Sequence, residues 1–175
     1  LARRAGLNLR KVVPYSSVTH ATPARQLARG RSRNLSPTAS LASPQNSVLG
    51  ERVRIGAHSS LWAGPGRGRI VLGDDVVIGP NVMVTAANYR FNDGSPVNDQ
   101  AMNEADVIVG RDAWIGAGAV LLPGAELGDG AIIGAGALVR GKAAPGDIMA
   151  TTPARPNGKR RGWVDADGAD GGAGA

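Results

Sequence analysis

Aliphatic residues recur at every sixth position through much of this sequence, and glycine follows most of them. The fifth position of each later hexad, counted from the aliphatic residue, is alanine. The same register occurs in two earlier blocks of the chain. The repeat positions are Leu49, Ile55, Leu61, Leu72, Ile78, Val84, Val109, Ile115, Leu121, Leu127, Ile133 and Val139.

A period of six fits neither an amphipathic helix, with its period of about 3.6, nor an alternating strand, with its period of about 2. It predicts a triangular coil whose three flat faces each take one hexad, with the aliphatic residue pointing inward and glycine easing the bend between faces. Such coils bury their apolar surface only by stacking on one another. Leu35 and Leu41 indicate a further coil, in which Ser47 breaks the register. The other coils are predicted at 49–66, 72–89, 109–126 and 127–144.

Two interruptions of the repeat indicate where functional elements lie. The spacing from Leu61 to Leu72 is 11 residues, so a short bulge is expected around the Gly-Pro-Gly-Arg-Gly segment at 64–68. The spacing from Val84 to Val109 is 25 residues, which predicts a long loop over 85–108. Long loops in a compact fold are commonly functional.

The positive charge of the chain is confined to its beginning. Residues 1–50 hold eight basic and no acidic residues, whereas the remainder holds 12 basic and 14 acidic residues. We therefore expect a basic extension over 1–34, flexible or partly helical, a β-helix domain over 35–157 and a disordered tail over 158–175. Because the folded part is near neutral, a nucleic-acid partner is not expected. Weak contact of the basic arm with an anionic membrane surface remains an alternative to simple solvation.

The composition narrows the remaining classes. The chain has no cysteine, which excludes disulfides and thiolate metal sites. No apolar run reaches the roughly 20 residues that a membrane-spanning helix needs. The expectation is a soluble, cytoplasmic protein with no transmembrane segment.

From about Leu49 to Arg155 the sequence resembles the hexapeptide-repeat acyltransferases, a family that includes galactoside, maltose and xenobiotic acetyltransferases and polysaccharide O-acetyltransferases. The resemblance implies an all-β fold, a left-handed parallel β-helix of about four to five coils with one long projecting loop. It also implies a homotrimer whose active sites lie between neighbouring prisms. The most specific segments are 72–82, 114–119, 122–125, 133–137 and 153–155, together with Asn-x-x-Phe at 88–91 and 96–100.

The same resemblance implies acetyl-CoA or another acyl-CoA as co-substrate, with no metal. Matched position by position, it assigns coenzyme contacts to Trp114, Ala117, Ala135, Arg140 and Arg155, the arginines being suited to phosphate. The structural alternative for Trp114 is a cap on a corner of the prism. For the two alanines the alternative is packing alone.

One departure from the family concerns its catalytic base. Family members carry an Asn-His pair in the loop, where this chain has Asn88 and Tyr89, which are therefore the candidate catalytic residues. A phenol has a reference pKa of about 10 and is a poor base at neutral pH. The chain has two histidines, His20 in the basic extension and His58 in an earlier hexad, and neither matches the family position. The loop acids Asp93 and Glu104 are substitutes only if they are not simply solvated.

Three functions are compatible with these features. The first is an acyl-CoA-dependent O-acetyltransferase or acyltransferase that modifies a saccharide or glycolipid hydroxyl in surface polysaccharide biosynthesis. The second is a non-catalytic trimeric scaffold or binding protein that has lost the family histidine. The third is a zinc hydratase of the carbonic anhydrase type, which needs three histidine ligands and is disfavoured by a chain that has two.

Overall fold

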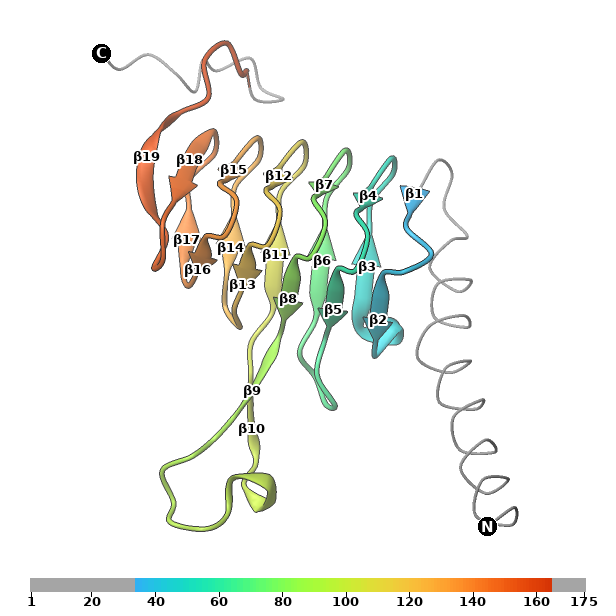
Figure 1. Ribbon diagram of the computed structural model, residues 1–175, viewed down its shortest axis with the longest axis vertical. Helices are drawn as coiled ribbons and strands as arrows, with labels where there is room; N and C mark the ends of the chain where they lie inside the picture. Colours follow the sequence, from blue (N-terminus) through green and yellow to red (C-terminus); the bar gives the residue numbers. More distant parts are fainter. Residues whose placement is uncertain (1–33, 165–175) are drawn as a thin grey trace, which may run out of the picture.

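The computed structural model describes residues 34–164, which form a triangular prism of stacked coils (Figure 1). Each coil contributes one strand to each of three parallel sheets, which we name A, B and C in chain order. The fold is the predicted left-handed β-helix of hexapeptide repeats. Sheets B and C each contain 5 strands, so the prism has 5 coils.

The strands are short, and all pairs within the three sheets are parallel except the last pair of sheet A. Sheet A has the order β1 (Asn34–Leu35), β4 (Arg54–Ile55), β7 (Val77–Ile78), β12 (Trp114–Ile115), β15 (Ile132–Ile133), β18 (Asp147–Ala150) and β19 (Arg155–Lys159). Sheet B contains β2 (Ser40–Ala42), β5 (Ser60–Trp62), β8 (Met83–Thr85), β13 (Val120–Leu121) and β16 (Leu138–Val139). Sheet C contains β3 (Ser47–Leu49), β6 (Ile70–Leu72), β11 (Val107–Val109), β14 (Glu126–Leu127) and β17 (Lys142–Ala143).

The predicted repeat residues fill the interior of the prism. Leu61, Ile115 and Leu121 are at most 1% exposed, and each is in register with an aliphatic residue of the next coil. The further coil indicated by Leu35 and Leu41 is present and ends in β3. Ser47 does not disrupt it, because a 3-10 helix at Pro44–Asn46 takes up the additional residues and β3 pairs with β6 in register. The fifth-position alanines are all buried, as predicted: Ala113, Ala119, Ala125, Ala131 and Ala137.

The glycine that follows each aliphatic residue has a different role from the one predicted. It does not make the bend, since the left-handed backbone falls two positions later, at His58 (φ 58°) and Asn81 (φ 57°), for example. The glycine is required by the next coil instead. A Cβ on Gly116 would lie 2.6 Å from the backbone nitrogen of Ala135, and one on Gly73 would lie 2.6 Å from that of Arg111. These glycines therefore set the close stacking of the coils.

The C-terminal boundary also differs from the prediction, which began a disordered tail at residue 158. The chain is packed through Val164, because β19 pairs with β18 and the Arg160 guanidinium donates a 2.8 Å hydrogen bond to Asp112. Trp163 is only 7% exposed and lies against Gly130. The basic extension up to residue 33 and the rest of the expected tail, 165–175, lie outside the described residues.

Candidate active site at the base of the projecting loop

The insertions in the repeat leave the prism at one corner, between sheets B and C. The 3-10 helix at Pro44–Asn46 connects β2 to β3, the Gly-rich segment at 64–68 connects β5 to β6, and the long loop connects β8 to β11. In Figure 1 the turn after β5 and the long loop project from the same side of the prism. Stacking of the coils thus gathers three segments that are distant in the sequence.

The long loop occupies the predicted position between β8 and β11 and starts as a hairpin. Strand β9 (Ala87–Tyr89) pairs antiparallel with β10 (Met102–Glu104), which sets Tyr89 opposite Met102 and Asn88 opposite Asn103. A second 3-10 helix, Val97–Asp99, lies in the outer part of the loop. The hairpin therefore holds the Asn88-Tyr89 pair close to the prism.

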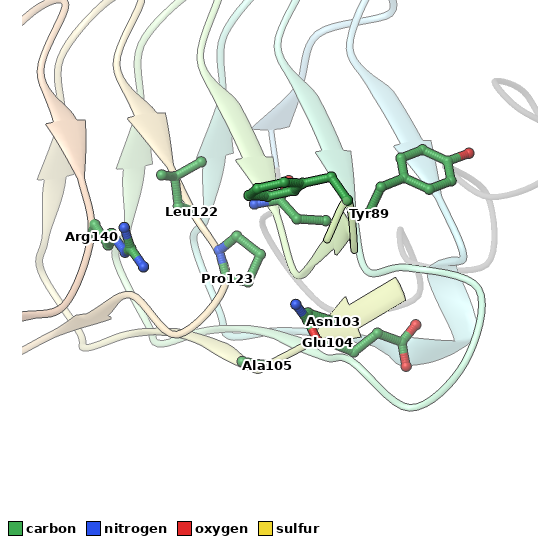
Figure 2. Close-up of a pocket in the computed structure, with 9 residues that line it drawn as sticks. Tyr89, Asn103, Glu104, Ala105, Leu122, Pro123 and Arg140 are labelled. Atoms are coloured by element: carbon green, nitrogen blue, oxygen red, sulfur yellow. The ribbon is translucent and has the colours of Figure 1, made fainter. Parts of the chain in front are cut away.

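A pocket of about 370 Å³ lies between this hairpin and the following coils. Figure 2 shows Tyr89 and Arg140 at opposite sides of it, with Leu122 and Pro123 between them. Tyr89 is 42% exposed, and in Figure 2 its hydroxyl is directed away from Arg140. The lining residues are Asn88, Tyr89, Phe91, Asn103, Glu104, Ala105, Leu122, Pro123 and Arg140.

The two loop acids are not placed as general bases. Both Glu104 carboxylate oxygens accept backbone N–H groups, from Arg67 and Gly66, and these bonds hold the pKa of Glu104 below its usual value. Asp93 accepts hydrogen bonds from the hydroxyl and the N–H of Ser95, which lower its pKa. A carboxylate with a lowered pKa is a weaker proton acceptor at neutral pH.

The histidine His58 lies away from the pocket. It occupies the turn between β4 and β5, at the corner between sheets A and B, and it is exposed with a left-handed backbone. Its place there agrees with a surface corner residue. The other histidine, His20, lies outside the described residues.

The residues assigned to the coenzyme fall at two corners. Ala117 and Ala135 take equivalent places at the corner between sheets A and B, where the Gly136 N–H donates to the Ala117 carbonyl at 2.9 Å. Trp114 projects outward from β12 and is 53% exposed. Arg155 is the first residue of β19. The residue before it, Ala154, donates its N–H to the Leu138 carbonyl and so attaches β19 to the last coil.

Arg140 belongs instead to the corner of the loop, where it lines the pocket with Tyr89. A single chain thus brings Asn88, Tyr89 and Arg140 together at the loop. Ala117 and Ala135 lie apart from them, at the corner between sheets A and B, which we call the alanine corner. Asn103 is a pocket residue that sequence reasoning missed. Its position depends on the β9–β10 pairing and on the hydrogen bond that Arg90 Nε donates to its side-chain Oδ1 at 2.9 Å, and no sequence motif marks either.

No group of three or more His, Cys, Asp or Glu side chains in residues 34–164 is arranged to hold a metal ion. No helix within the same range has the length and apolar character needed to cross a membrane.

Two family models match segments of the repeat. The model of the bacterial transferase hexapeptide (six repeats) matches residues 106–141, and that of the hexapeptide repeat of succinyl-transferase matches residues 48–86. No curated protein sequence gives a significant match.

Solved structures of acetyltransferases share the fold. A maltose O-acetyltransferase from Clostridium difficile 630 is 27% identical, with a TM-score of 0.67 over 77% of this chain and 71% of that one. A hexapeptide-repeat acetyltransferase from Vibrio cholerae O1 biovar eltor, complexed with acetyl-CoA, is 19% identical with a TM-score of 0.70, over 81% and 75% of the two chains. A galactoside acetyltransferase in complex with coenzyme A is 21% identical with a TM-score of 0.65; 74% of this chain is covered, and it spans 64% of the galactoside enzyme. The chain thus carries hexapeptide repeats of the transferase type over residues 48–86 and 106–141, and it shares its fold with solved hexapeptide-repeat acetyltransferases.

Proposed function

We propose that this protein is an acyl-CoA-dependent O-acetyltransferase that acts on a hydroxyl group of a saccharide or glycolipid. The observation that carries the proposal is the pocket at the base of the loop, which combines the Asn88-Tyr89 pair with Arg140. The similarity to a maltose O-acetyltransferase, at 27% identity, supports this class of acceptor. The Vibrio cholerae relative complexed with acetyl-CoA supports the choice of co-substrate.

The residues present fit these two ligands. Ala117 and Ala135 have small side chains, and within residues 34–164 their backbone N–H groups have no hydrogen-bond acceptor, so they are available to the pantetheine amides or the thioester carbonyl. Arg155 and Arg140 suit the coenzyme phosphates. The side-chain amides of Asn88 and Asn103 are suited to orient acceptor hydroxyls.

In the reaction, the acceptor oxygen attacks the thioester carbonyl carbon. A C–O bond forms, the C–S bond breaks, and the hydroxyl proton finally reaches the sulfur of coenzyme A. Tyr89 carries a phenol where the family is expected to carry an imidazole, and a phenol is the poorer proton acceptor. Without the family histidine, the enzyme is expected to be slow.

We further expect a homotrimer, because the two groups of predicted site residues lie at different corners of one prism. A threefold assembly can bring the loop corner of one copy to the alanine corner of the next. The outward faces carry exposed apolar side chains suited to such contact, including Val77 and Trp114 on sheet A and Met83 on sheet B. Light scattering on the full chain should report three copies. A stable monomer at micromolar concentration would contradict a site shared between chains.

A non-catalytic trimeric scaffold is the second candidate, and a specific observation favours it. The family histidine is replaced by Tyr89, while Glu104 and Asp93 are engaged by other hydrogen bonds. Such a protein would keep the coenzyme groove or the acceptor pocket for binding alone.

Acetyl-CoA binding and acetyl transfer distinguish the two candidates. We expect acetyl-CoA to raise the melting temperature of the full chain, because a ligand that binds only the folded state stabilises it. The variant Arg155→Ala, assayed at the same protein concentration, should show a smaller shift. Transfer to a panel of saccharides, followed by release of the coenzyme thiol, would then support the enzyme. Binding with no transfer across the panel would favour the scaffold, and the absence of any shift would contradict the coenzyme assignment.

A further inference from the structure

The Gly-rich turn at 64–68 encloses the root of the long loop. Gly66 and Gly64 both face the Glu104 carboxylate, and a Cβ on either would lie 2.6 or 2.7 Å from one of its oxygens. Gly68 lies close to the other side of the root, since a Cβ there would lie 2.9 Å from the Ala86 carbonyl oxygen. The turn can close around this root only because these three positions lack side chains.

Hydrogen bonds attach the turn to Glu104 through both carboxylate oxygens. The Gly66 N–H donates to Oε1 at 2.8 Å, and the Arg67 N–H donates to Oε2 at 2.8 Å. On the other side of the turn, the Asn46 side-chain amide donates to the Gly66 carbonyl at 2.9 Å. Hydrogen bonds to an ionised carboxylate are stronger than those between neutral groups.

A neighbouring ion pair secures the same junction. The Arg69 N–H donates to Asp106 Oδ1 at 3.0 Å, and the Arg69 guanidinium contacts Oδ2 at 2.6 Å. Arg69 immediately precedes β6, and Asp106 immediately precedes β11. The second coil therefore holds the returning strand of the loop just before it re-enters the prism.

The hairpin connects this point of attachment with the pocket. Glu104 is paired with Ala87 in the hairpin, and the next two pairs contain Asn88 and Tyr89. Two-stranded hairpins alone are marginally stable in water, so one that projects from the prism needs an anchor. In Figure 2 the Glu104 carboxylate points away from Arg140, and its bonds to Gly66 and Arg67 hold the hairpin on that side.

We propose that Glu104 and the turn at 64–68 form a lock that fixes the hairpin, and that Glu104 is a positioning residue for Tyr89 and the acceptor pocket. Its effect on turnover rests on the proposed function, whereas its effect on the loop does not. This role differs from that of a substitute base, because both carboxylate oxygens are occupied by backbone donors. The lock also explains why the 64–68 insertion is rich in glycine.

The test compares Glu104→Gln, Glu104→Ala and Gly66→Ala, with Asp99→Asn as a matched control in the outer part of the loop. Amide hydrogen exchange at Gly66 and Arg67 should accelerate by about tenfold or more in Glu104→Ala, as expected from losing hydrogen bonds to a charged group. Glu104→Gln should fall between it and the native chain, since a carboxamide accepts through one oxygen only. Proteolysis within 86–106 should also be faster than in the native chain, moderately in Glu104→Gln and more strongly in Glu104→Ala. Gly66→Ala keeps the carboxylate and should loosen the loop as well, so the test survives if Glu104→Ala fails to fold.

Activity separates positioning from catalysis. We expect Glu104→Gln to lower kcat/KM for the acceptor while leaving the pH profile of transfer unchanged in shape. Loss of the acidic, low-pH limb of that profile in Glu104→Gln would overturn the positioning role, because it would identify Glu104 as the base. Native exchange rates and native proteolysis in all three variants would overturn the lock itself. If no variant and no native protein transfers acetyl groups, the proposed function fails, while the exchange data still decide on the lock.

Discussion

Replacing Tyr89 with histidine should raise the rate of acetyl transfer by about 10² or more, the lower end of what a positioned general base contributes. Tyr89 lines the pocket at the base of the loop and is 42% exposed, and the resemblance to the family assigns it the position of the histidine. Imidazole titrates near pH 6.5 and accepts a proton readily at neutral pH, which a phenol does not. The measurement is kcat/KM from the release of coenzyme thiol, with the native chain and the variant at equal concentration.

The control for this prediction is Tyr89→Phe, which should change the native rate little because the phenol is not the base. Transfer by Tyr89→His should also increase as the pH rises through the pKa of the imidazole, and the native chain should lack this step. A robust native activity that Tyr89→Phe abolishes would refute the interpretation, because the phenol would then be essential. If acetyl-CoA binds but neither protein transfers the acetyl group to any saccharide of the panel, the non-catalytic scaffold is favoured over the enzyme.

The architecture could be predicted from the sequence because the aliphatic position of each hexad identifies the side chain that points into the prism. Ile115 and Leu121 are spaced by six and are both fully buried, so periodicity alone identifies the inside of the prism. The first coil was harder to recognise. The connection from Leu41 to Leu49 contains a 3-10 helix that shifts the spacing from six to eight, so the period is lost although the register between coils is kept.

The features that could not be predicted from the sequence are those that depend on contacts between coils. The sequence marks the glycines but not their role, because Gly116 meets Ala135 only after one complete turn of the chain. The same holds for the candidate site. Its loop and the Asn88-Tyr89 pair follow from motifs, whereas the bond between Gly66 and Glu104 joins residues 38 positions apart. Neither local propensity nor the hexad pattern contains that information.

Replacing Trp163 with alanine should lower the free energy of unfolding by about 3 kcal/mol, the low end of the range for a buried tryptophan. Composition predicted disorder in this segment because glycine, alanine and aspartate surround the tryptophan. The folded chain instead buries its indole, while Arg160 upstream bonds to Asp112 and to the Gly146 carbonyl. The segment thus covers the last coils at the corner between sheets C and A. Urea denaturation at a fixed protein concentration measures the loss, and Val164→Ala, at an exposed neighbouring position, should change stability by less than about 0.5 kcal/mol.

A pair of glycine variants tests the same contact from the opposite side. Gly130 and Gly136 have nearly the same left-handed backbone, with φ of 66° and 70°, so alanine carries a similar backbone penalty at both, about 1–2 kcal/mol. Only at Gly130 would the new Cβ collide with the Trp163 ring, since nothing lies within 4 Å of a Cβ at Gly136. Gly130→Ala should therefore destabilise the protein more than Gly136→Ala does, and the difference should shrink when Trp163 is already alanine. Equal effects of the two glycine variants, together with native stability of Trp163→Ala, would mean that the indole does not pack on this corner and that the ordered chain ends before it.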